Sequence, residues 1–321
     1  MRAFRASFLT LGLALSGANF EAAADTPQEA LPENAAANEA PLVAYSLELG
    51  PRDDDAFVYQ SRALRAAEHE LERHPPPAGE ECATTLGASR FANQYRHLAY
   101  VQFETGEFEA SIQSYRAALE CTPRAPAIHA GMSAAYLAMG QTEEAHAEIQ
   151  KALAVDPDDR GLLEARARLD FLQERWADAM AQLRLSTIEE HRAEFGTYAE
   201  CLFWLAQRRA GVREPEVLPH DAKEDDWPLP VLDTLLGRKT QKRLVEEIRE
   251  QPSDQTVREW LTEALFYVGE RYLADGDIDT ARKHFAAVVN LKQLNFVEYG
   301  MARAELARLR KLENPKQPGE P

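Results

Sequence analysis

The sequence predicts an all-α fold in which helical hairpins stack into a superhelix. Large apolar residues recur at helical spacing, as in "ALFYVGERYLADGDIDTARKHFAAVV" over 264–289, where Gly-Asp separates two helical runs. A long central block repeats with a fixed period. No segment shows the alternation of apolar and polar residues that is typical of a strand.

The central block repeats every 34 residues. Gly106 and Gly140 are 34 residues apart, and so are Pro123 and Pro157. A period of 34 with two helices in each unit is typical of the tetratricopeptide repeat, whose hairpins bury their apolar stripes only by stacking on one another. The same spacing relates Leu98 to Met132, Phe108 to Thr142 and Trp176, Tyr115 to Ile149, and Ala118 to Ala152 and Ser186.

The period places three hairpins, at 92–123, 126–157 and 160–187. The third is degenerate, because Glu174 replaces the glycine of the turn. A helix over 54–74 precedes them, stopped by three prolines, and a helix over 188–209 follows, so that 53–210 forms one unit. We expect a Pro-rich acidic linker over 211–230. Residues 231–312 then form short helices, a further hairpin at 262–291 and a final helix over 296–312.

Both ends of the chain differ in composition from the centre. Residues 1–24 carry Arg2 and Arg5, a short apolar run and a small-residue site before Asp25, which predicts a cleaved export signal. Residues 25–52 are rich in Ala, Pro, Glu and Asn and predict a disordered tail, with the apolar stretch 41–49 as a segment that could dock on the body. A second disordered tail is expected over 313–321.

The signal predicts a periplasmic protein. A lipoprotein signal would need a cysteine at position 19, where the chain has Asn, and the apolar run is too short to span a bilayer, so we expect no membrane insertion. The net charge of −17 opposes binding to nucleic acid. No cofactor is expected.

Three cysteines leave their pairing open. The hairpin register places Cys121 close to the chain that enters the first repeat, where Cys82 lies, and a bridge would contribute about 4 kcal/mol by closing the loop between them. The alternative is three unpaired thiols, including Cys201.

The C-terminal third carries a more specific pattern. The segments "VLDTLLGRKTQKRLVEEI" and "EWLTEALFYVGERYLADGDIDTARKHFAAVVNLKQLNFVEYGMARAELARL" combine a Leu-Gly turn, a Tyr-Val-Gly hairpin and a last helix opened by Asn-Phe-Val-Glu-Tyr. This order resembles the NlpI lipoprotein family of periplasmic tetratricopeptide proteins. The resemblance implies a non-catalytic adaptor that binds cell-wall endopeptidases and a processing protease. It also implies a homodimer, with "LNFVEYG" and residues 41–74 as candidate surfaces. The chain departs from the family in lacking the lipidated cysteine.

The residues themselves favour binding over catalysis. His69 and His74 are not at metal-ligand spacing, "EEH" over 189–191 fits a solvated helix start, and the serines of the repeats lack a nucleophile motif. We therefore predict no catalytic and no metal-binding residues.

The first helix of each repeat is expected to line a concave groove. Counting inward positions gives partner-binding candidates with small residues in the middle repeat and aromatic or Arg side chains on both sides, which suits an apolar or basic peptide segment. They are Asn93, Arg96, Tyr100 and Phe103 in the first repeat, Ala134 and Leu137 in the second, and Glu164, Arg168 and Phe171 in the third.

Three functional hypotheses remain from the sequence. The first is a periplasmic adaptor for peptidoglycan hydrolases or their protease. The second is a structural component of an envelope secretion or polysaccharide-export assembly. The third is an enzyme with an unrecognised site.

Overall fold

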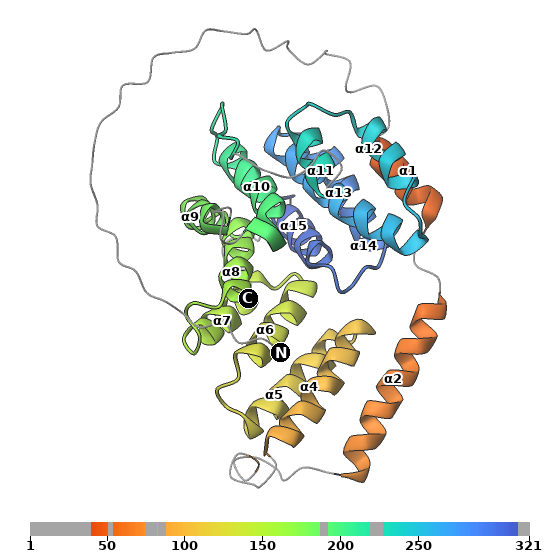
Figure 1. Cartoon of the computed structure of the whole chain (residues 1–321), viewed down its shortest axis with the longest axis vertical. Coiled ribbons are helices and arrows are strands. Elements are labelled where there is room, and N and C mark those ends of the chain that lie inside the picture. Colours follow the sequence, from red (N-terminus) through yellow and green to blue (C-terminus); the bar gives the residue numbers. More distant parts are fainter. Residues whose placement is uncertain are drawn as a thin grey trace, which may run out of the picture. The chain divides into compact units, whose positions relative to one another are not determined.

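A computed structural model of the chain describes residues 40–50, 54–74, 82, 88–186, 192–218 and 227–313. Within these ranges every regular element is a helix, and the all-α prediction is confirmed (Figure 1). The predicted export signal, most of the predicted N-terminal tail, the "EEH" segment and nearly all of the C-terminal tail lie outside the described residues.

The central block forms three consecutive helical hairpins. They are α4 (Ala88–Glu104) with α5 (Phe108–Cys121), α6 (Pro126–Ala138) with α7 (Thr142–Leu153), and α8 (Arg160–Leu172) with α9 (Trp176–Ser186). Each pair coincides with one unit of the 34-residue period. The hairpins stack in chain order, α5 on α6 and α7 on α8, while α2 (Asp54–Arg73) packs on α4 and α10 (Arg192–Arg209) packs on α9.

The hairpin turns need a residue in the left-handed backbone conformation. Gly106 and Gly140 adopt φ values of 81° and 76°, which glycine reaches without a steric penalty. Glu174 holds the same position in the third hairpin with φ 59°, a conformation that costs a non-glycine residue free energy. Its carboxylate lies 3.2 Å from Arg209 and 3.0 Å from Arg308, so two ion pairs offset the strain.

Serines of the repeats hold the two helices of the first hairpin together. The Ser111 hydroxyl donates to the carbonyl of Ala99 at 2.6 Å, and the Ser114 hydroxyl donates to the side chain of Gln102 at 2.6 Å. Both hydroxyls are buried between α4 and α5. Their role is to satisfy polar groups at a close helix contact.

The C-terminal part is arranged around one long helix, α13 (Asp254–Ala274), which pairs with α14 (Ile278–Asn290). α13 begins eight residues before the predicted hairpin start at 262, because the Ser253 hydroxyl caps it by accepting the backbone N–H of Thr256 at 3.1 Å. The other helices of this part are α11 (Leu229–Leu235), α12 (Gln241–Arg249) and α15 (Val297–Glu313).

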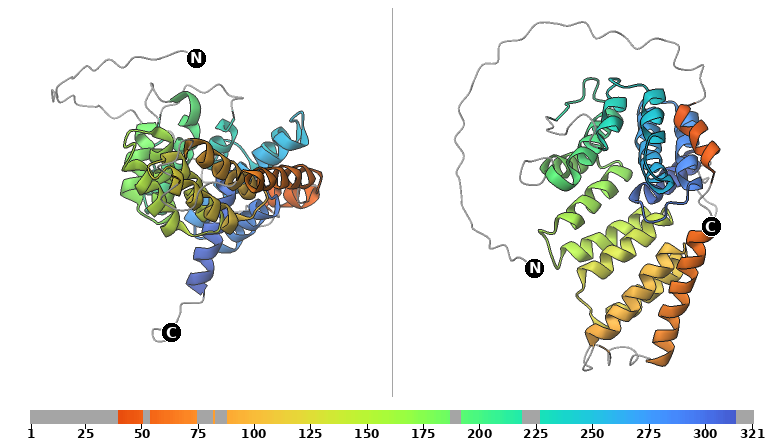
Figure 2. Two further views of the ribbon diagram at one scale, coloured as in Figure 1. Left: turned by 90° about the horizontal axis from the view of Figure 1, so that it is seen from below. Right: turned by 45° about the vertical axis from the view of Figure 1, so that its right-hand side comes forward.

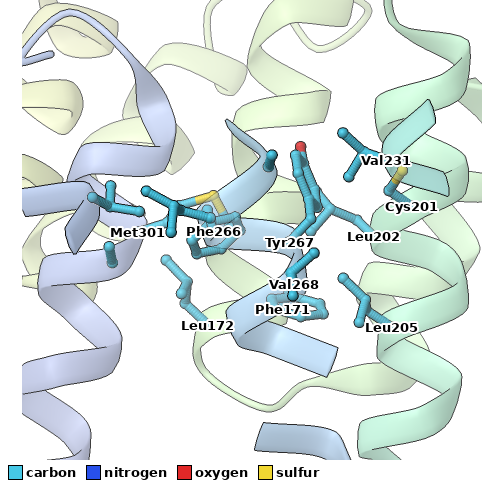
Figure 3. Packing of buried hydrophobic residues seen from close by; sticks show 14 of the residues in the cluster. Phe171, Leu172, Cys201, Leu202, Leu205, Val231, Phe266, Tyr267, Val268 and Met301 are labelled. Atoms are coloured by element: carbon cyan, nitrogen blue, oxygen red, sulfur yellow. The ribbon is translucent and has the colours of Figure 1, made fainter. Parts of the chain in front are cut away.

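One hydrophobic core joins the repeats to the C-terminal helices. Figure 3 shows Phe171 of α8 close to Val268 of α13 and Leu205 of α10. Phe266 and Tyr267 of α13 are also fully buried. The predicted division at 211–230 is therefore not a boundary between independent cores.

The predicted linker over 211–230 is anchored at both described ends. Leu218 is buried, and α11 begins at Leu229, two residues before the predicted end of the linker. The Trp227 ring stacks on Trp260 with centroids 4.2 Å apart, and its indole N–H donates to Glu263. Pro230 does not prevent the helix, because a proline in the first turn removes no intrahelical hydrogen bond.

The predicted N-terminal tail contains a docked helix, α1 (Pro41–Leu49), which corrects its extent of 25–52. The apolar stretch 41–49 packs on α12, α13 and α14 (Figure 2). Leu42 is fully buried, the Arg249 guanidinium lies 4.3 Å above the Tyr45 ring, and Arg258 donates to the carbonyls of Leu49 and Gly50. Burial of these groups offsets the entropy of ordering the segment.

The last helix, α15, returns to the repeats and packs on α6, α8, α13 and α14. Gly300 lies against Leu137 of α6, and Tyr299 lies beside Phe108 of α5. Residues 298–302 are buried within the chain. The last three residues of the "LNFVEYG" segment are therefore used for intramolecular packing, while Asn295 is exposed, and its role as a dimer surface stays a prediction.

Candidate functional site

The repeats form an apolar groove of about 500 Å³ between α6 and α8, which we call the inner groove. The small residues Ala127, Ala134 and Gly161 are exposed in it, and the larger lining residues Ile149, Leu162 and Leu169 are buried. Val297, the first residue of α15, lines it from the C-terminal part of the chain. The remaining lining residues are Pro126, Ala130, Ser133, Leu137, Asp159, Ala165 and Arg168.

A smaller cavity of about 330 Å³, which we call the polar pocket, lies over the first repeat. Asn93, Arg96, His97 and Tyr100 reach it from α4, and Tyr115 reaches it from α5. Ala127 lines both cavities, so they meet at the start of α6.

Local packing shapes the polar pocket. The Tyr115 ring occupies the space beside Gly131, where a Cβ would come 2.3 Å from the ring. Burial raises the pKa of Tyr115, and the nearby charge of Arg96 opposes that rise. Tyr100 is 55% exposed, which is high for an aromatic side chain.

The structure brings six of the nine predicted groove residues to the two cavities. Asn93, Arg96 and Tyr100 line the polar pocket, while Ala134, Leu137 and Arg168 line the inner groove. Leu137 is only 7% exposed and contributes mainly to the base of the groove. Glu164 is buried one turn from Arg168 and lies 3.6 Å from it. Of this pair only Arg168 lines the inner groove.

Of two further predicted groove residues, Phe171 is a core residue and Phe103 is partly buried against the core. Phe171 is fully buried, with its ring edge against Trp176 at 5.4 Å and the Arg209 guanidinium 5.9 Å from its centroid. Phe103 packs on Phe108 at 5.4 Å, in a cluster that also contains Tyr299. Both residues lie at the carboxyl ends of first helices. Later segments of the chain cover this part of the surface that the repeat register predicts to face inward.

Thirteen of the nineteen residues that line the two cavities were not among the nine predicted ones. Val297 comes from α15 and Tyr115 and Ile149 come from second helices, so a count of first-helix positions cannot find them. His97 and Asp159 flank the counted positions. The Asp159 carboxylate also caps α8 by accepting the backbone N–H of Leu162 at 2.9 Å.

Buried ionisable groups hold α15 and α13 in place. Arg209 of α10 lies 2.5 Å from Glu270 of α13 and 3.6 Å from Glu305 of α15. Burial raises the pKa of Glu270, the charge of Glu305 raises it further, and Arg209 opposes both. These groups line neither cavity, and their chemistry fits a structural role.

A second buried carboxylate lies between α10, α11 and α13. Glu263 accepts hydrogen bonds from the Tyr198 hydroxyl at 2.9 Å and from the Trp227 indole. Burial raises its pKa to about 8, with the charge of Glu298 adding to the rise and the two hydrogen bonds opposing it.

Cys82 and Cys121 are joined by a disulfide that spans 39 residues of sequence. Cys201 is a free thiol buried in the core, and burial raises its pKa. The sequence left open either a bridge between Cys82 and Cys121 or three unpaired thiols. The structure has the bridge.

The described part of the chain contains neither a metal-ligand cluster nor a membrane-spanning helix. No three His, Cys, Asp or Glu side chains of that part come together in a way that could hold a metal ion. No helix in it has the length and apolar character needed to cross a membrane.

Comparisons with known proteins agree with the helical-hairpin architecture. Residues 102–169 match the family model of the tetratricopeptide repeat. Among solved structures, the chain is similar to YrrB, a tetratricopeptide protein with an unusual peptide-binding site, at 16% identity and a TM-score of 0.37 over 74% of this chain and 97% of that one.

Two further solved structures are similar. PilF of Pseudomonas aeruginosa shares 16% identity with a TM-score of 0.37, over 68% of this chain and 100% of that one. Yeast Tom70 shares 17% identity with a TM-score of 0.32, over 72% of this chain and 53% of that one. Residues 102–169 thus match the tetratricopeptide repeat, and the described helices form an all-α fold of stacked tetratricopeptide-type hairpins.

Proposed function

We propose that this chain is a non-catalytic adaptor of the periplasm that holds a segment of a partner protein in the inner groove. The observation that carries the proposal is the groove itself, an apolar channel of about 500 Å³ in which the small residues Ala127, Ala134 and Gly161 are exposed. Small side chains let the backbone of a bound segment approach closely, and apolar burial then drives binding. Tetratricopeptide folds serve in general as scaffolds for protein–protein interaction.

The partner class follows from the resemblance of the C-terminal third to the NlpI family. We propose peptidoglycan endopeptidases, their processing protease, or both. The predicted export signal at 1–24 supports a periplasmic location, where such enzymes act. The disulfide between Cys82 and Cys121 also fits an oxidising compartment.

Co-purification from the host's periplasm tests this proposal. Ala134 is exposed in the groove, so Ala134→Trp fills the channel without disturbing the core, and Ala177→Trp places the same ring at an exposed position of α9. We expect an endopeptidase or protease to co-purify with the parent protein and with Ala177→Trp, and not to co-purify with Ala134→Trp. Recovery of export or secretion components alone would instead support the envelope-assembly hypothesis.

Direct assay of the pure protein tests the non-catalytic part. Isolated peptidoglycan and a peptide substrate mixture should remain uncleaved in the absence of a partner. Hydrolysis that survives further purification and is abolished by substitution of a described residue would overturn the adaptor proposal in favour of an enzyme.

A further inference from the structure

We propose that the polar pocket receives an acidic side chain of the same partner segment whose apolar part lies in the inner groove. This inference rests on the proposed function and specifies the chemistry of the segment. It replaces the sequence-based expectation of an apolar or basic segment.

The lining of the polar pocket selects for a carboxylate. Asn93, Arg96 and Tyr115 offer hydrogen-bond donors in their ordinary protonation states, and His97 offers a ring N–H. None of the residues that line this pocket is an acid. A group that accepts several hydrogen bonds and carries negative charge satisfies these donors best.

Arg96 carries the positive charge that would attract a carboxylate to the polar pocket. Within the described residues no carboxylate oxygen lies within ion-pair distance of its guanidinium, although the chain has a net charge of −17 and many of its other Arg side chains form ion pairs. Arg96 is exposed and its charge acts on the Tyr115 hydroxyl, which places it at the mouth of the pocket. Arg and Tyr are among the most frequent anchors of protein interfaces.

One acid does lie near the pocket. Glu104, one turn after Tyr100 on α4, accepts a hydrogen bond from the Tyr100 hydroxyl. That contact uses the Tyr100 donor and leaves Arg96, His97, Asn93 and the Tyr115 hydroxyl to face a ligand. A basic side chain in the same place would meet Arg96 and His97, which disfavours it.

The two cavities fix the register of the segment. They meet at Ala127, and they lie over three successive first helices, α4, α6 and α8. Packed helices are about 8–10 Å apart, so the path from α4 to α8 is roughly 20 Å long. An extended chain covers that distance with about six residues. The segment therefore carries its acid about four to six residues from the apolar side chains that fill the α6–α8 part.

Selection from a library of random dodecapeptides tests the inference without a known partner. The purified protein, Arg96→Gln and Ala134→Trp are each immobilised and used to enrich displayed peptides, after thermal melting shows that both variants are folded. We expect peptides enriched by the parent protein to combine apolar residues with Asp or Glu at the spacing above, and peptides enriched by Arg96→Gln to lose the acid.

Synthetic versions of the enriched peptides give the quantitative result. Replacing the acid by its amide should weaken binding to the parent protein roughly tenfold, the loss expected for a charge-assisted hydrogen bond. The same replacement should have little effect on binding to Arg96→Gln, and Arg96→Lys should restore part of the preference.

The remaining outcomes separate this inference from the proposed function. Peptides that Ala134→Trp excludes, but that are basic or uncharged, would overturn the acid preference and leave the groove as the binding site. Enrichment that is identical for the parent protein and Ala134→Trp, or no enrichment at all, would overturn the groove as a binding site and the acid preference with it.

Discussion

Gly300 of α15 lies directly against Leu137 of α6: a Cβ on Gly300 would come 2.9 Å from the Leu137 Cγ and 3.1 Å from its carbonyl carbon. The absence of a side chain lets the last helix of the chain rest on the middle repeat. This contact decides how much of the repeat surface remains for a partner. The inner groove lies beside this contact, because Leu137 of α6 and Val297 of α15 both line it.

Gly300→Ala tests that contact. Because the added methyl group meets backbone as well as side chain, we expect the free energy of unfolding to fall by about 1–3 kcal/mol, the usual cost of overpacking. Denaturant unfolding followed by tryptophan fluorescence measures it. Gly161→Ala is the matched control, since its nearest neighbour would be the Asp159 carboxylate at 3.4 Å, and it should leave stability unchanged or higher.

Docking of α1 is tested by two leucines of the same helix. Leu42 is fully buried and Leu47 is 71% exposed. Leu42→Ala should lower the free energy of unfolding by about 2–5 kcal/mol through lost burial and a cavity. Leu47→Ala should change it by less than about 0.5 kcal/mol. Equal effects would mean that 41–49 is not held on α12–α14.

The disulfide should stabilise the first repeat. Closing a 39-residue loop is worth about 4 kcal/mol on the chain-entropy model. We expect a reductant to lower the unfolding midpoint of the parent protein and to leave a Cys82→Ala, Cys121→Ala variant unaffected. An equal response of both proteins would show that the reductant acts elsewhere.

Stability should fall as the pH rises above neutrality. Burial raises the pKa of Glu263 to about 8, above its value of about 4.3 in the unfolded chain, so the folded protein binds the proton more tightly. The stabilisation from this tighter proton binding is therefore complete below about pH 4.3. It is lost progressively as the pH rises from there to about 8. Buried His284, with a pKa lowered to about 4, acts in the opposite direction below about pH 6.5, which makes the range above that value the informative one.

We expect the Glu263 contribution to the free energy of unfolding to drop by about 1–2 kcal/mol between pH 6.5 and pH 8.5, and Glu270, whose pKa burial also raises to about 8, acts in the same direction. Glu263→Gln keeps an acceptor for Tyr198 and Trp227 and removes the charge, so its profile should be flatter in this range. Glu250→Gln, at an exposed position, should follow the parent profile. A Glu263→Gln profile as steep as the parent's would assign the pH dependence to other groups.

Much of the fold follows from the sequence because its signals are local. Glycines, prolines and apolar residues at a spacing of 34 define the hairpins, and even the degenerate turn at Glu174 keeps the left-handed conformation of Gly106. The period also identifies the face on which Tyr100, Ala134 and Arg168 lie.

The remainder depends on contacts between distant parts of the chain. Counting positions within a repeat predicts that both Phe171 and Arg168 face the groove. In the structure α10 and α13 bury Phe171, whereas Arg168 lines the inner groove. Val297 and the docking of α1 depend on how the ends of the chain return to its middle. No repeat period contains that information.

Photo-crosslinking from Ala134 tests the central claim most directly. A photoreactive amino acid is placed at Ala134 in the inner groove, or at Ala177 on the outer helix α9, in cells of the protein's own host. If the groove holds a partner segment, Ala134 gives a discrete crosslink to another protein and Ala177 does not. No crosslink from Ala134, or the same crosslinks from both positions, would contradict the account.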